Sequence, residues 1–301
     1  MEPRLCRKTK AYAKLVLLSL LTLAFALACI FMFDLDTASR RTRTNRQMQA
    51  LADRIDANPD DKEALNKLIS HLDDSYQWAR TSAANRLGSL RSKAKGAVPA
   101  LGKALNSNNP FLRRTAALAL RDIGTNATAA IPDLIKALNL GNEDAAWFSA
   151  ETLGMFREDA KTIAPALIGC LKIYDLENLY GDSGPQLAFE AADSLAKFGV
   201  DAQEAIPALK AGLSHTNIQL KFHFSSAIRA IDPQDEDSLK FLIELLNHPW
   251  MDSWALTTLG NLGTNSAPAI PSIENYLERQ LSPSSRQHAE FALAKIRKST
   301  P

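Results

Sequence analysis

Short apolar stretches that begin at a proline recur along this chain of 301 residues. The proline position is occupied by Pro99, Pro132, Pro165, Pro207, Lys240 and Pro271 in turn. Successive positions are 33, 33, 42, 33 and 31 residues apart. Proline is tolerated in the first turn of a helix, because its missing N–H would have no intrahelical acceptor there. The pattern therefore predicts a series of helices that each begin near one of these positions.

A second apolar-periodic stretch follows each of these helices after a short turn. In residues 112–124 the apolar side chains recur at helical spacing and Gly124 ends the stretch. A single two-helix unit cannot bury its apolar face alone, so successive units must stack and share a core. We count seven units, at residues 60–91, 96–124, 128–157, 161–199, 202–231, 235–263 and 267–298.

The segments Ala-Ile-Pro-Ala-Leu at 205–209 and the second-helix stretches at 80–88 and 113–124 resemble HEAT repeats, in the short form of bilin-lyase-like HEAT proteins. The resemblance implies an all-α, right-handed α-solenoid whose second helices line the concave surface. A tetratricopeptide array has a similar period, but its Trp/Leu-Gly/Tyr signature does not recur in this chain. We therefore expect a HEAT-like repeat domain over residues 60–301.

The N-terminal residues are predicted to anchor the chain in a membrane. Residues 15–33 carry no charge, and as a helix they would span about 28 Å, close to the hydrocarbon thickness of a bilayer. Residues 1–36 are therefore predicted to be a signal anchor. The protein is predicted to be a single-pass membrane protein with an extracytoplasmic repeat domain. Two alternatives stay open: a signal peptide cleaved after 26–28, or a weak lipobox at Cys29.

Residues 37–59 are predicted to form a linker and a short amphipathic helix that caps the first unit. Met48, Leu51 and Ile55 fall on one face of this helix. Asn58–Asp61 then reads as a turn followed by a helix N-cap. A calcium loop is excluded there, because Asp61 stands where that loop needs a glycine.

Charge disfavours nucleic acid as a partner. Residues 1–46 hold nine Lys and Arg against three Asp and Glu, and the remainder holds 26 against 30, a net charge of −4. A body with that balance lacks the basic footprint that binds phosphate backbones.

The sequence shows no catalytic or metal-binding constellation. The five histidines are scattered and the chain has no His-Glu dipeptide, the ligand pair of HEAT-fold diiron hydroxylases. Gly181–Pro185 resembles the nucleophile loop of trypsin-like proteases, but a helical solenoid does not supply the partner residues. Cys170 lies on an apolar helix face and is expected to be a buried, inert thiol. We therefore expect neither an enzyme nor a small-molecule cofactor.

One set of residues is a candidate binding site. Aligned on their repeats, the second helices of units three, four and five carry Trp147, Phe189 and Phe222 at one position, where the outer units carry polar residues. We call these three residues the aromatic row. On a helical wheel this position lies roughly 150° from the core, so we expect the aromatic row on the concave surface. Packing against a neighbouring helix is the alternative interpretation.

Unit four also holds about nine extra residues within 173–185, which include Tyr174 and Tyr180. An insertion beside exposed aromatic residues is a common place for a specific site in a repeat array. The sequence thus predicts a membrane-tethered, non-catalytic scaffold that binds a protein or peptide in its groove. The alternative is a bilin-lyase-like or other HEAT-fold enzyme or cofactor handler.

Overall fold

The computed structural model describes residues 37–139, 143–171, 184–279 and 281–299. These residues form helices and turns and contain no β-strand. The predicted all-α solenoid is confirmed.

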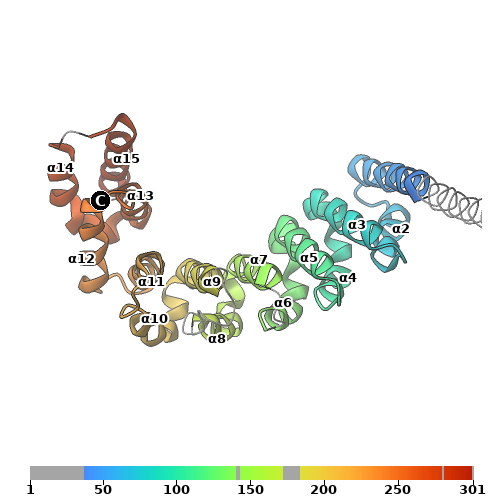
Figure 1. The fold of residues 1–301 in the computed structure, drawn as a ribbon, viewed down its shortest axis with the longest axis horizontal. Helices are drawn as coiled ribbons and strands as arrows, with labels where there is room; N and C mark the ends of the chain where they lie inside the picture. The colour runs from blue at the N-terminus through green and yellow to red at the C-terminus, as the bar shows by residue number, and fades with distance from the viewer. Residues whose placement is uncertain (1–36, 140–142, 172–183, 280, 300–301) are drawn as a thin grey trace, which may run out of the picture.

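The helices form consecutive pairs, and each pair falls within one predicted unit to within one residue at its ends. The pairs are α2 (Lys62–Ser70) and α3 (Gln77–Ser89), α4 (Val98–Ala104) and α5 (Pro110–Ile123), α6 (Ile131–Ala137) and α7 (Glu143–Leu153), α8 (Ala160–Cys170) and α9 (Gly184–Phe198), α10 (Ile206–Gly212) and α11 (Ile218–Ile231), α12 (Glu236–Glu244) and α13 (Asp252–Leu262), and α14 (Ile270–Leu277) and α15 (Pro283–Ser299). Figure 1 shows the pairs stacked into an arc, with the second helices α5, α7, α9, α11 and α13 along its inner side. The second helices therefore line the concave surface, as the resemblance to HEAT repeats implies.

Proline stands in the first turn of four first helices, α4, α6, α10 and α14, as the pattern predicts. Helix α8 differs, because it begins at Ala160 and Pro165 lies inside it. The difference arises from the preceding connection, where the short 3-10 turn Arg157–Asp159 leads directly into helix. Helical backbone is thus already established five residues before the proline.

Several units are joined by a turn that we did not predict from the sequence. Gly124, Gly199 and Gly263 have φ of 74°, 58° and 56°, and Arg91 at the same place has φ of 52°. Each begins a seven-residue 3-10 segment that ends where the next first helix starts: Arg91–Ala97, Gly124–Ala130, Gly199–Ala205 and Gly263–Ala269. Glycine adopts positive φ at little cost, so three of these turns have the residue that suits them and Arg91 is strained.

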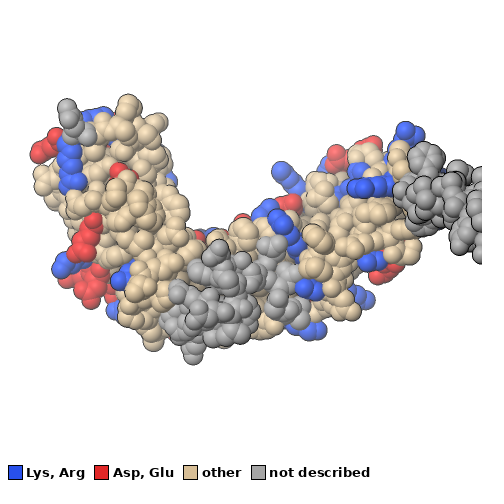
Figure 2. Space-filling view, viewed as in Figure 1, with Lys and Arg blue, Asp and Glu red and all other residues tan. Residues whose placement is uncertain are grey.

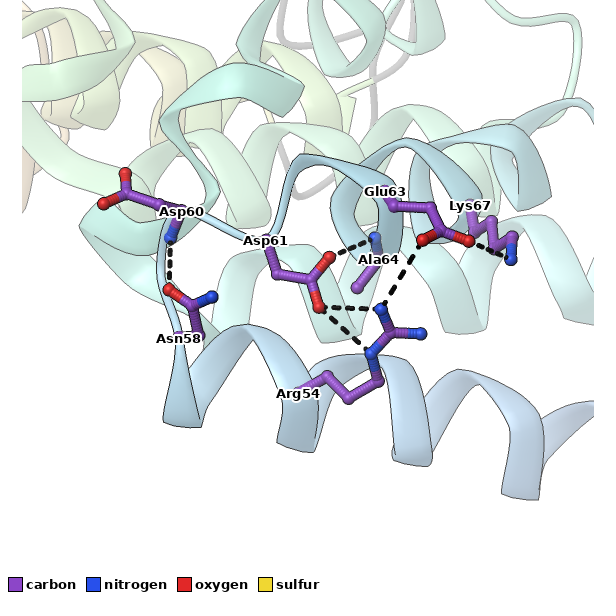
Figure 3. A network of polar contacts seen from close by, with 7 residues as sticks. All are labelled: Arg54, Asn58, Asp60, Asp61, Glu63, Ala64 and Lys67. Atoms are coloured by element: carbon purple, nitrogen blue, oxygen red, sulfur yellow. Dashed lines mark hydrogen bonds and ion pairs between the residues drawn. The ribbon is translucent and has the colours of Figure 1, made fainter.

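Helical residues 37–57 pack on the first unit. Met48 and Ile55 are fully buried in the core, and Leu51 packs against it. The helical segment is longer than the short helix we expected. Figure 3 shows how its C-terminal end meets α2: Arg54 Nε donates to Asp61 Oδ2 at 3.0 Å.

Asp61 is the N-cap of α2, as predicted. Its Oδ1 accepts from the Ala64 N–H at 2.9 Å, and Asn58 Oδ1 accepts from the Asp60 N–H at 3.2 Å (Figure 3). The hydrogen bond from Ala64 is the main cause that lowers the pKa of Asp61. The turn-and-cap interpretation of residues 58–61 is confirmed.

The predicted membrane location requires a correction. Among the described residues, no helix is long and apolar enough to cross a membrane. A span needs about 20 consecutive apolar residues, whereas α15 has 17 residues in all and helical residues 37–57 include Arg43 and Arg46. On this finding a single-pass membrane protein with an extracytoplasmic repeat domain is not supported. The predicted span at 15–33, and Cys29, lie outside the described residues.

Candidate protein-binding face

The three residues of the aromatic row lie on adjacent inner helices, but two of them are not exposed. Phe189 on α9 is 8% exposed to solvent, and Phe222 on α11 is 6% exposed. Trp147 on α7 is half-buried. The expectation that the whole aromatic row faces solvent is therefore wrong.

The next unit explains this burial. The ring of His223 stacks on Phe189 with centroids 4.6 Å apart and planes 13° apart. The ring of Trp254 lies against Phe222 at a tilt, with centroids 5.7 Å apart and planes 57° apart. A helical wheel treats one helix alone, so it cannot show that the following second helix brings an aromatic side chain over each phenylalanine.

His223 and Trp254 are the residues that the sequence reading missed. Each stands one position after the aromatic-row position of its own unit, so the same repeat alignment would have found them. We call Phe189, Phe222, His223 and Trp254 the inner aromatic cluster. His223 Nδ1 lies 2.9 Å from Asp193 Oδ1, which fixes its ring over Phe189.

The C-terminal end of the inner aromatic cluster is open to solvent. Trp254 on α13 is 47% exposed, and Trp250, in the turn before α13, is 54% exposed. On α15, Phe291 is 48% exposed. Monomeric proteins seldom expose several large apolar side chains close together unless they bind something there.

Three carboxyl groups, those of Glu151, Glu190 and Asp193, lie near one another on α7 and α9. Glu190 on α9 is partly buried beside Trp147, and burial raises the pKa of its carboxyl group. The nearby carboxylates of Asp193 and Glu151 also raise the pKa of Glu190, whereas the Trp147 indole N–H lowers it. Glu151 itself accepts from Arg121 Nη1 at 3.1 Å.

Arginines cover the aromatic rings of the N-terminal arm instead. The guanidinium carbons of Arg114 and Arg121 lie 5.8 and 5.4 Å from the ring centre of Phe148. Arg41 lies 5.9 Å from the ring of Trp78. Figure 2 shows Lys and Arg along this arm, whereas the inner wall at α13 and α15 is mostly uncharged. The two ends of the concave surface thus offer different chemistry.

Tyr174, Tyr180 and most of the 173–185 insertion lie outside the described residues. Their predicted role in binding stays a prediction.

The described residues hold no group of three or more His, Cys, Asp and Glu side chains that could bind a metal ion. Cys170 is 2% exposed, and burial raises its pKa to about 12. The predicted burial of Cys170 is confirmed, and a thiol with that pKa is a poor nucleophile at neutral pH.

Comparisons with known proteins agree with this architecture. Residues 65–154 match the sequence model of HEAT repeats. This part of the chain contains HEAT repeats. No curated protein matches the sequence.

Among solved structures, the complex of CpcE and CpcF of phycocyanin lyase from Nostoc sp. PCC7120 is similar, with a TM-score of 0.54 and 26% identity over 77% of this chain and 94% of that chain. An engineered protein has a TM-score of 0.49 at 21% identity, covering 83% of this chain and 71% of that chain. A designed armadillo repeat protein has a TM-score of 0.46 at 17% identity, and the match covers 77% of this chain and 99% of that chain.

Proposed function

We propose that this chain is a non-catalytic binding module whose concave surface binds a protein or peptide. The observation that carries the proposal is the inner aromatic cluster, which ends in the half-exposed Trp254; Trp250, four residues earlier in the chain, is also exposed. Tryptophan supplies a large contact area and is enriched among the residues that dominate binding energy.

The arrangement beneath Trp254 supports a role in binding. Its ring rests on Phe222 at 5.7 Å and lies 6.4 Å from the ring of His223. A side chain held by such contacts loses little conformational entropy when a partner covers it. Trp147, half-buried on α7, would extend the contact toward the centre, while Phe189 and Phe222 act as supports.

The similar solved structure is itself a complex of two proteins, CpcE and CpcF, which supports a protein partner. The same similarity to a phycocyanin lyase keeps an enzyme or cofactor handler as the second candidate function. A bound chromophore in the purified protein would favour that candidate.

The test compares Trp254→Ala with Val200→Ala after a partner has been identified by co-purification with the intact chain. Val200 is 65% exposed in the turn that follows α9, so its substitution serves as a matched control for loss of exposed apolar surface. We expect Trp254→Ala to weaken the measured affinity at least about tenfold and Val200→Ala to leave it unchanged.

Circular dichroism must show that both variants are folded. Equal affinities for the intact chain and a folded Trp254→Ala variant would contradict the proposed face. A further comparison with Tyr174→Ala and Tyr180→Ala then tests whether the insertion contributes. Visible absorption that accompanies the purified chain, with no protein partner, would replace the proposal with the second candidate.

A further inference from the structure

The hydrophobic core of the described residues is divided into two clusters. The first runs from Met48 to Ile231, and the second contains Phe222 and runs on to Ile296. Helix α11 contributes to both clusters, with Phe224 in the first and Phe222 in the second. The core therefore changes from one cluster to the other at α11, whose Phe222 also contacts Trp254 of α13.

One position in the second helices holds a buried arginine at this boundary. Seven residues after the aromatic-row position, the side chain faces the next unit; we call this the junction position. It is occupied by Gly88, Arg121, Gly154, Ala196, Arg229 and Gly260. A Cβ atom added to Gly88 would lie 2.8 Å from Ala119 Cα, and one added to Gly260 would lie 3.0 Å from Ala292 Cα. Small residues at this position thus let neighbouring second helices touch.

Arg229 fills this position between α11 and α13 with a buried charged side chain. It is 4% exposed. Its Nε donates to the Asn265 carbonyl at 2.9 Å and its Nη1 to the Asp235 carbonyl at 3.1 Å. Helices α11 and α13 make few contacts with each other, and polar contacts to backbone replace close helix packing.

The connection at this point, like the one after α7, differs from the other connections between units. Helix α11 ends at Asp232 in an extended conformation, with φ −120° and ψ 93°, and Pro233 follows. The positive-φ residue and the seven-residue 3-10 turn found after α3, α5, α9 and α13 are missing here. A cleft of about 510 Å³ lined by Arg229, Pro233 and Pro268 lies beside the connection.

We propose that Arg229 and residues 232–235 form a hinge, and that the parts 37–231 and 236–299 rotate about it as rigid bodies. Figure 1 shows that the arc bends sharply here, between α11 and α13. Rotation about this point would change the width of the concave surface. The hinge does not depend on the proposed binding function, because no partner enters its test.

Pulsed electron–electron double resonance on the full chain tests the hinge. One spin-label pair spans it, at Lys161→Cys on α8 and Ala294→Cys on α15; a control pair lies within the first part, at Lys103→Cys and Lys161→Cys. All three positions are exposed. Cys6 and Cys29 are replaced by serine, and Cys170 stays because it is buried. We expect the distance distribution across the hinge to be at least about twice as wide as that of the control pair.

Arg229→Ala and Arg121→Ala provide a matched comparison at the junction position. Arg229→Ala removes the hydrogen bonds across the hinge and should widen or shift the spanning distribution, whereas Arg121→Ala should leave both distributions unchanged. Equal widths for the two pairs in the otherwise unsubstituted chain would overturn the proposal. So would a folded Arg229→Ala variant with an unaltered spanning distribution. If Arg229→Ala does not fold, the comparison of the two pairs decides alone.

Discussion

The junction between α9 and α11 and the junction between α11 and α13 solve the same packing problem differently. At the first, the junction position is Ala196, and α9 and α11 pack closely within one continuous core. At the second, the junction position is Arg229 and the core divides. Residue type alone does not set the boundary, because Arg121 holds the junction position between α5 and α7 within one continuous core. The boundary differs in that Arg229 is buried and bonded to backbone carbonyls.

The largest expected effect comes from adding volume at a tight junction. Gly88→Ala places a Cβ 2.8 Å from the backbone of α5, so α3 and α5 must separate. We expect a loss of about 2 kcal/mol in the free energy of unfolding, measured by urea denaturation with circular dichroism.

Gly169→Ala is the matched control for this substitution. Gly169 lies within α8, and nothing stands within 4 Å of a Cβ added there. The better helix propensity of alanine should raise stability by about 0.5 to 1 kcal/mol. If Gly88→Ala is also stabilising, the junction position does not set the distance between second helices.

A comparable loss is expected at the polar junction for a different reason. Arg229→Met keeps much of the side-chain volume but leaves the Asp235 and Asn265 carbonyls without their donor. Each buried carbonyl that loses its partner is costly, so we expect a loss of about 2 kcal/mol in urea denaturation.

Arg121→Met tests whether position alone accounts for that loss. Arg121 pairs with Glu151 where both side chains are about one-third exposed, and such pairs contribute at most about 1 kcal/mol. Similar losses of unfolding free energy for Arg121→Met and Arg229→Met would mean that the burial of Arg229 does not increase its contribution to stability.

Acid should remove the stability that the Asp235 carboxylate contributes beside the hinge. The pKa of Asp235 is lowered because hydrogen bonds from Lys210 and the Ser238 N–H outweigh the opposing effect of burial. A carboxyl group with a lowered pKa contributes stability above its unfolded pKa, and this contribution is lost as pH falls through the folded value. We therefore expect the stability difference between the intact chain and Asp235→Asn to shrink below about pH 4, in urea denaturation at a series of pH values. A difference that does not change with pH would contradict this.

The smallest expected effect has the opposite sign. The pKa of Glu190 is raised, chiefly by burial, so its charged form destabilises the fold above that pKa. Glu190→Gln should raise the urea midpoint at about pH 7, and the gain should vanish as pH falls below the unfolded value of about 4.3. If the higher urea midpoint of Glu190→Gln persisted in acid, the gain in stability would come from packing and not from the removal of a charge.

The sequence alone predicted the helix pairs of the solenoid because each unit repeats the same local signals. Prolines such as Pro132 mark the first helices, and apolar residues at helical spacing mark the second ones. The N-cap at Asp61 followed from residue types a few positions apart. The burial of Cys170 followed from the apolar face on which it lies. These features depend on a residue and its close neighbours in sequence, which is why they could be predicted.

Contacts between units were beyond that kind of reasoning. The wheel placed Phe189 on an exposed face, but a histidine 34 residues later covers it. Likewise, nothing in the local pattern of α11 indicates that Arg229 would be buried and bonded to Asn265, which lies 36 residues away. The sequence determined the units, because helix formation follows local periodicity and capping. Only the tertiary structure decided which side chains remain exposed and where the core divides, because burial depends on side chains that the next unit supplies.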